Sequence, residues 1–148
     1  MHEYMNQQIN FMVKMCKDNP TESIGKSKEV LESCCKTIIE RNGETVPNSI
    51  NFNKLVKKTL ELLNISNDEL ETNKTEREIL KKITGSLNGL IAGINELRNF
   101  YGSGHGHSST FKGLSERHAE LCVGASIALT RYLWDTYSTS VERSEMER

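Results

Sequence analysis

Apolar residues recur every three or four positions along most of the chain, and this spacing most constrains what it can fold into. The longest series comprises Ile79, Ile83, Leu87, Leu90, Ile94 and Leu97. A period of three to four residues places side chains on one face of an α-helix, whereas a strand alternates with a period of two. Blocks rich in Val, Ile, Thr and aromatic residues are scarce, and the chain contains only two prolines, Pro20 and Pro47. The sequence therefore predicts an all-α protein.

The spacing predicts about five helices, over residues 2–17, 22–41, 52–64, 75–97 and 114–141. Thr21, Thr75 and Ser115 are candidate N-caps, because their hydroxyl groups can accept from free backbone N–H groups. Asn42 and Gly43 are expected to end the second helix. The segments between the helices are mostly short, and 148 residues suit one domain. We expect a single compact helical bundle spanning residues 1–148.

The charges of the chain are almost balanced, with 19 Lys and Arg against 20 Asp and Glu. A protein that binds nucleic acid broadly is usually basic, so the balance argues against such a surface. Brief contact with a nucleic-acid substrate at one patch remains compatible with it. No apolar run reaches 18 residues, and the N-terminus lacks the order of a signal peptide. We expect a cytoplasmic protein that has no membrane contact.

Cysteine and glycine each suggest a structural role. The sequence shows no export signal, so we expect its cysteines to be reduced thiols that pack as small apolar groups. These cysteines are Cys16, Cys34, Cys35 and Cys122. Three glycines, at 85, 89 and 93, lie inside the fourth predicted helix. Each costs about 1 kcal/mol relative to alanine in a helix. They favour either a smooth face for close approach of another helix or local flexibility.

The segment from residue 98 to 107 carries the most chemistry. In it, three glycines alternate with a serine and two histidines. This pattern is typical either of a backbone shaped to present imidazoles or of a mobile loop. The candidate catalytic residues are Arg98, Asn99 and His105, and the candidate supporting residues of the segment are Gly102, Gly104 and His107.

Arginine and histidine together suit phosphoryl chemistry on RNA. Six residues separate Arg98 from His105, so a loop can fold back and bring the two side chains together. A histidine that titrates near neutrality can accept a proton from a ribose 2′-hydroxyl or donate one to the leaving oxygen. A permanently charged arginine can stabilise the charge that develops on the phosphate. No metal or other cofactor is needed when the substrate supplies its own nucleophile.

Several segments, in order and spacing, resemble the abortive-infection C-terminal domain of bacterial phage-defence proteins. The matching segments are 23–26, 28–32, 35–38, 53–55, 89–90, 97–99, 102–106, 118–121 and 125–133. The resemblance extends from about residue 10 to 137. It implies a HEPN-like helical bundle, a class in which many members are metal-independent RNases.

The resemblance also implies an active-site pattern of an arginine, a polar residue and a histidine four to six positions further on. Arg98, Asn99 and His105 match this pattern at its long end. The implied reaction is attack of the 2′-hydroxyl, which leaves a cyclic phosphate, usually in a homodimer that brings two motifs together. The implied role is growth arrest or antiviral defence, in which a neutralising protein or antitoxin would be a further partner besides RNA.

Other residues have alternative interpretations. Glu29 and Glu32 are candidates to orient Arg98, or they belong to a solvated helix face. His118 is a candidate supporting residue, or a hydrogen-bonded core histidine. With His105, His107 and Cys122 it would form a zinc site of unusual spacing, which we do not expect.

A different function class also fits the sequence. The long arginine–histidine gap and the absence of a strongly basic face favour a non-catalytic HEPN-like module that binds RNA, a nucleotide or a partner protein.

Overall fold

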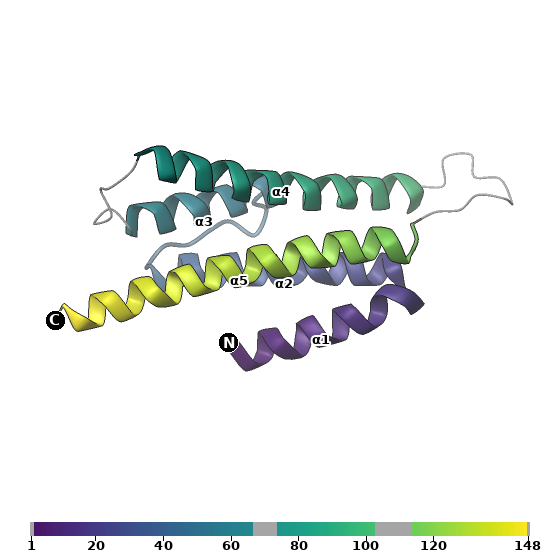
Figure 1. Ribbon diagram of the computed structural model, residues 1–148, viewed down its shortest axis with the longest axis horizontal. Helices are drawn as coiled ribbons and strands as arrows, with labels where there is room; N and C mark the ends of the chain where they lie inside the picture. The colour runs from purple at the N-terminus through teal and green to yellow at the C-terminus, as the bar shows by residue number, and fades with distance from the viewer. Residues whose placement is uncertain (1, 67–73, 103–113, 148) are drawn as a thin grey trace, which may run out of the picture.

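The computed structural model describes residues 2–66, 74–102 and 114–147, which form five helices and no strand. The helices are α1 (His2–Asp18), α2 (Pro20–Arg41), α3 (Phe52–Ser66), α4 (Lys74–Gly102) and α5 (Glu116–Met146). Figure 1 shows α2, α4 and α5 running lengthwise beside one another, with α1 along α2 and α5, and α3 beside the first half of α4. The predicted all-α bundle is confirmed.

The centre of the bundle is the contact between α2 and α5, which is lined by small side chains. The hydroxyl group of Ser126 donates to the backbone oxygen of Ser27 at 2.7 Å. The Oγ of Ser27 lies 3.6 Å from the Sγ of Cys122. Small side chains let the two helices approach closely enough for a side chain of one to reach the backbone of the other. Larger apolar side chains fill the space around this seam, namely Met12, Ile24, Leu31, Ile38, Leu129 and Leu133.

The start of α2 corrects one predicted cap. Asn19, and not Thr21, is the N-cap, because its side chain accepts from the backbone N–H of Glu22 at 3.3 Å. Pro20 occupies the first turn, where its missing N–H group is not needed. At the other end, the predicted stop at Asn42 and Gly43 is confirmed, since Gly43 has φ +82°.

The bounds of α4 and α5 differ from the prediction. Helix α4 begins at Lys74, so Thr75 lies inside it and is not its N-cap. The helix also continues to Gly102, because Asn99 and the two aromatic residues that follow it do not break a helix. The predicted cap of α5, Ser115, is confirmed.

The apolar series of α4 does not lie wholly in the core. Ile79 and Ile83 are 54% and 53% exposed, whereas Ile91 is fully buried. The face of α4 that packs on α2 and α5 is thus rotated away from the predicted one. Leu121 of α5 is likewise 51% exposed. Of the two alternatives for Gly85, Gly89 and Gly93, close approach of another helix is wrong for the described residues, because a Cβ at any of the three would meet no atom within 4 Å.

All four cysteines are free and buried, which confirms the predicted role of the thiols. Burial raises the pKa of Cys35 to about 12, although a hydrogen bond with Thr59 acts in the opposite direction. Burial also raises the pKa of Cys34 strongly. None of the helices in the described ranges combines the length and the apolar character that a membrane span requires.

Candidate active site

Arg98 lies on the inward face of α4, one turn before the helix ends. It follows Ile91 by seven residues, or two helical turns, so both side chains leave the helix in nearly the same direction. Ile91 is fully buried and Arg98 is half-buried. The predicted helix ended at residue 97, which put Arg98 at the start of a loop. In the structure the backbone of Arg98 is helical.

The guanidinium group of Arg98 lies against Gly25 of α2. A Cβ at position 25 would collide with Nη1 of Arg98 and would lie 3.5 Å from its Cζ. The hydrogen atom of glycine therefore leaves room that the guanidinium group occupies. Gly25 is inside a helix, where glycine is unfavourable by about 1 kcal/mol relative to alanine. The contact with Arg98 gives this glycine a reason to be there.

Cys122 of α5 lies near enough to Arg98 for the positive charge to act on its thiol. Burial raises the pKa of the Cys122 thiol, and the hydrogen bond with Ser27 and the positive charge of Arg98 lower it in part. The guanidinium group therefore lies at the junction of α2, α4 and α5. A cation that is held in a helix and packed against a neighbouring helix is preorganised for an anionic ligand.

Asn99 follows Arg98 but faces a different side of α4. Its side chain is exposed and borders a groove of about 200 Å³ between α2, α4 and the start of α3. Lys28 of α2 and Asn95 of α4 border the same groove. Arg98 and Asn99 are thus neighbours in sequence that face adjoining surfaces.

The two candidate carboxylates of α2 have lysine partners. Glu29 lies 3.7 Å from Lys26, and Glu32 lies 3.8 Å from Lys28. Both pairs join residues three or four positions apart on one helix, as surface pairs commonly do. These contacts fit the solvated-face interpretation of Glu29 and Glu32.

His118 has a structural contact at the start of α5. Its Nδ1 accepts from the backbone N–H of Ser115 at 3.1 Å, so the side chain helps to close the N-terminal turn. An accepting Nδ1 leaves the proton of a neutral ring on Nε2. This geometry fits a hydrogen-bonded structural histidine.

The remaining predicted site residues fall at or beyond the end of α4. Gly102 is the last residue of that helix. Gly104, His105 and His107 lie outside the described residues. Within the described ranges no group of three or more His, Cys, Asp and Glu side chains is arranged to hold a metal ion.

Sequence reasoning missed two features of this region. Gly25 was noticed only as part of a resemblance, although a lone glycine within a helical pattern already signals a packing requirement. Asn95 was also missed, although an amide next to the buried Ile94 interrupts an otherwise apolar face. Each signal is a single residue, and the role of that residue depends on which side chains of the neighbouring helix lie opposite it.

Comparison with protein families shows to which family the chain belongs. The family model for the HEPN-like domain of the abortive-infection type matches residues 2–137. The chain belongs to this family. Searches of curated proteins and of solved structures returned no match. The matched range takes in all of α2, α3 and α4, so the HEPN-like domain includes the whole Arg98 site.

Proposed function

We propose that this HEPN-like domain is a metal-independent endoribonuclease of an abortive-infection or toxin–antitoxin system. The observation that carries the proposal is the guanidinium group of Arg98, held at the junction of three helices against Gly25. A cation in this position can bind a phosphate without rearrangement. Its permanent charge would stabilise the extra negative charge of the pentacoordinate phosphorus.

In the proposed reaction, the 2′-oxygen of a ribose attacks the adjacent phosphorus atom. A bond forms between O2′ and phosphorus, and the bond from phosphorus to the 5′-oxygen of the next nucleotide breaks. His105 would accept the proton of the 2′-hydroxyl or supply the proton that the leaving oxygen takes up. The products are a 2′,3′-cyclic phosphate and a 5′-hydroxyl end, and no metal takes part.

Asn99 would contact the ribose in this scheme. Its exposed amide lies one residue beyond Arg98 and faces the adjoining groove, so a nucleotide whose phosphate meets Arg98 has its sugar nearby. An amide can donate to and accept from a hydroxyl group, which suits orientation of the 2′-oxygen. Asn99 would therefore position the nucleophile, while Arg98 acts on the charge.

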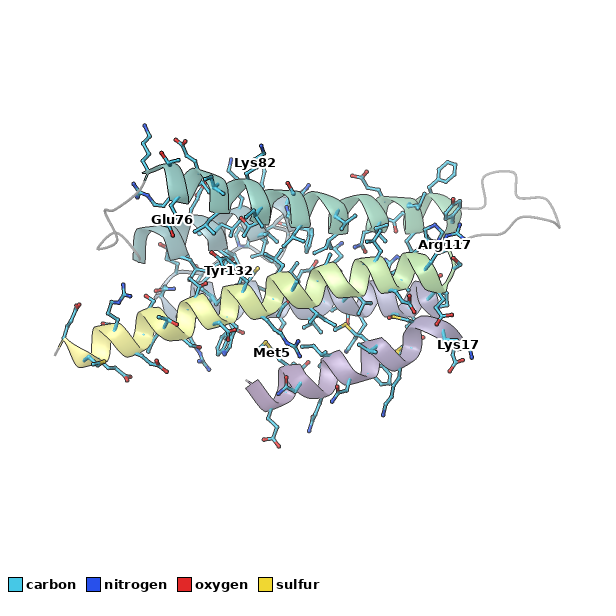
Figure 2. All side chains as sticks on the ribbon, in the orientation of Figure 1. Met5, Lys17, Glu76, Lys82, Arg117 and Tyr132 are labelled. Atoms are coloured by element: carbon cyan, nitrogen blue, oxygen red, sulfur yellow. The ribbon has the colours of Figure 1, made fainter. Side chains whose placement is uncertain are left out.

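We also propose a homodimer formed through the seam of α4 and α5. Both helices carry exposed apolar side chains, with Ile79 and Ile83 on α4 and Leu121 on α5. Figure 2 shows Tyr132 on the side of α5 that faces α4, and this ring is 39% exposed. Exposed large apolar side chains on neighbouring helices are typical of a protein interface.

A charge on this surface tests the dimer. Leu121→Glu is expected to shift the protein from dimer to monomer in sedimentation equilibrium, because it buries a carboxylate in the interface. Glu120→Gln changes an exposed neighbour and serves as the control. A monomeric wild-type protein, or a dimer unchanged by Leu121→Glu, would contradict the proposed surface.

Cleavage of RNA in the presence of a chelator tests the proposed enzyme. Purified protein, cellular RNA and excess EDTA are incubated, and the new ends are mapped. The wild type is expected to produce cyclic-phosphate ends, whereas His105→Ala is expected to produce none. Undiminished cleavage by His105→Ala would overturn the mechanism. RNA binding without cleavage by the wild type would instead identify a non-catalytic module.

A further inference from the structure

Helices α3 and α4 form a groove that the proposed reaction does not use. We call it the α3–α4 groove and define it by Asn53, Lys57, Leu60 and Glu61 of α3 and Lys81 and Gly85 of α4. Its volume is about 350 Å³, which lies at the lower end of the range of small-molecule sites. The groove is therefore large enough for one small molecule.

The floor of the groove is apolar. Leu60 is half-buried and packs against the core of the bundle. On the α4 side Gly85 brings no side chain, and a Cβ at this position would meet no atom within 4 Å. Glycine lowers the stability of a helix relative to alanine, and packing gives no reason for it here. Its effect is to leave room beside Leu60 for the flat face of a ring.

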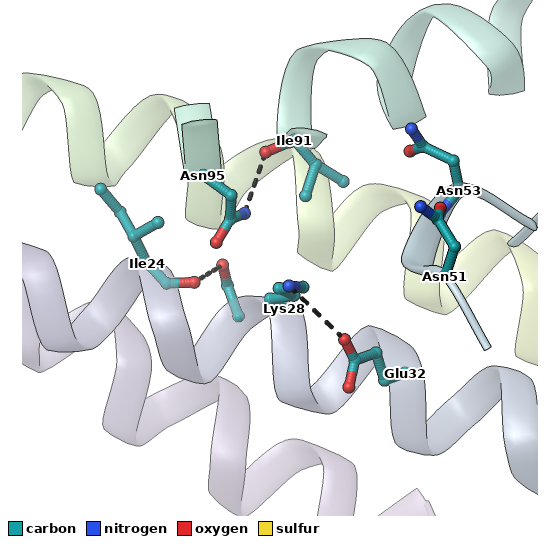
Figure 3. A network of polar contacts seen from close by, with 8 residues as sticks. Ile24, Lys28, Glu32, Asn51, Asn53, Ile91 and Asn95 are labelled. Carbon is teal, nitrogen blue, oxygen red and sulfur yellow. Dashed lines mark hydrogen bonds and ion pairs between the residues drawn. The ribbon is translucent and has the colours of Figure 1, made fainter. Parts of the chain in front are cut away.

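Lysine side chains border the groove from both helices. Lys57 comes from α3 and Lys81 from α4, and neither forms an ion pair in the part of the chain that the structure describes. Lys28 of α2 differs, because it lies 3.8 Å from Glu32, as the dashed line in Figure 3 shows. Two ammonium groups at one groove match the charge of a phosphate monoester, which is about −1.5 to −2 near neutral pH.

The other polar groups of the groove suit the sugar of a nucleotide. Asn53, at the start of α3 in Figure 3, accepts from Nδ2 of Asn88 at 3.4 Å, so its own NH2 group remains to donate to a ligand. Glu61 adds a carboxylate to the lining. Such a group repels a bare anion, whereas it accepts readily from the hydroxyl groups of a ribose.

We propose that the α3–α4 groove binds a nucleoside monophosphate. The base lies on the apolar floor beside Leu60, and the phosphate lies between Lys57 and Lys81. The carboxylate of Glu61 accepts from the ribose hydroxyl groups. These residues are not part of the Arg98 site, so the proposal does not depend on cleavage of RNA.

Titration of the full chain with small probes, followed by NMR spectroscopy of the backbone amides, tests the groove. The probes are the four common 5′-nucleoside monophosphates, the matching nucleosides and inorganic phosphate. The wild type is expected to bind one monophosphate about tenfold more tightly than its nucleoside or inorganic phosphate, because hydrogen bonds to charged groups contribute on that order. Equal affinity for inorganic phosphate would indicate an adventitious ion only. That result, or no binding of any monophosphate, would overturn the proposal.

A pair of double variants tests the lysines. Lys57→Gln with Lys81→Gln is expected to weaken binding of the monophosphate about tenfold, since each exposed ion pair contributes up to about fivefold. Lys54→Gln with Lys82→Gln removes the same charge from exposed positions of the same helices and should leave affinity unchanged. Figure 2 shows Lys82 on the side of α4 that faces away from the bundle. Equal affinity of the two double variants would overturn the proposal.

A larger side chain in the groove tests the floor. Gly85→Leu is expected to abolish binding, whereas Gly89→Leu, at a second open position of α4 outside the groove, should retain it. Leucine favours a helix over glycine, so both variants are expected to fold, and circular dichroism checks this. Undiminished binding by Gly85→Leu would overturn the proposal. Loss of binding in Arg98→Ala alone would also overturn it, because the nucleotide would then occupy the Arg98 site.

Discussion

Helices α2 and α4 both contain glycine, but in opposite surroundings. Gly25 of α2 is covered by the guanidinium group of Arg98, and a Cβ there would collide with it. Gly85, Gly89 and Gly93 of α4 have open space where a Cβ would be. The same residue type thus has a packing reason in α2 and none within the described part of α4. The difference marks the junction of α2, α4 and α5 as the place where the fold gives up helix stability to position a side chain.

The largest effect is predicted for the substitution that removes the guanidinium group beside Gly25. Arg98→Ala is expected to reduce RNA cleavage by about 100- to 1000-fold, because a preorganised charge that faces a transition state contributes on that order. The measurement is the rate of cyclic-phosphate formation in EDTA. Arg131→Ala removes an exposed arginine of α5 and should leave the rate unchanged. Equal rates for Arg98→Ala and the wild type would remove Arg98 from the mechanism.

The next prediction moves the guanidinium group without removing it. Gly25→Ala is expected to reduce the cleavage rate by about 10- to 100-fold, since a displacement near 1 Å can have such an effect. The thermal midpoint should change little, because the flexible end of Arg98 can shift away from the new methyl group. Rates are measured beside circular dichroism melts. A large drop in the midpoint would show that Gly25 serves the fold and not the site.

The buried cysteines of α2, the helix that also contains Gly25, predict that stability depends on pH. The pKa values of Cys34 and Cys35 are raised in the fold by burial. The unfolded thiols lose protons above about pH 8.5, whereas the folded thiols stay protonated. Stability is therefore complete below that pH and falls as the pH rises toward about 12, the folded pKa of Cys35. Each thiol contributes about 1.4 kcal/mol per pH unit at most.

Urea unfolding from pH 7 to 10 measures this slope. Cys35→Ala should lower the free energy of unfolding at pH 7 and make the decline above about pH 8.5 less steep, because one thiol no longer titrates. A decline of the same steepness in both proteins would show that other groups cause it.

The smallest predicted effect concerns a glycine in open space. Gly85→Ala is expected to raise the free energy of unfolding by about 0.5 to 1 kcal/mol, through better helix propensity and a more restricted unfolded chain. Urea unfolding at neutral pH measures it, and cleavage should not change. A loss of stability would reveal a contact at Gly85 that the described residues do not include.

Sequence reasoning succeeded where local chemistry decides the structure. The helical spacing, the glycine stop after α2 and the cap at Ser115 depend on neighbouring residues, and each was predictable. The buried face of α4 was not, because Ile79 and Ile83 repeat at the same period as Ile91. Only the contacts with α2 and α5 distinguish the two faces.

The candidate site also has features that local sequence predicts and features that it does not. Arg98 and Asn99 could be selected from their spacing to His105, since the motif is local. Their directions could not, because the end of α4 was expected at residue 97 and the helix continues to Gly102. The pairing of Arg98 with Gly25 joins residues 73 positions apart, from 25 to 98, and no local pattern encodes it.

In the proposed mechanism Arg98, held against Gly25, acts on the phosphate of RNA. The most direct test of this mechanism is the rate of cyclic-phosphate formation in EDTA for the wild type, Gly25→Ala and Gly85→Ala. Gly25→Ala is expected to be at least tenfold slower than the wild type. Gly85→Ala, which adds the same methyl group in open space, is expected to be as fast as the wild type. Equal rates for all three proteins, or no cyclic phosphate from any of them, would contradict it.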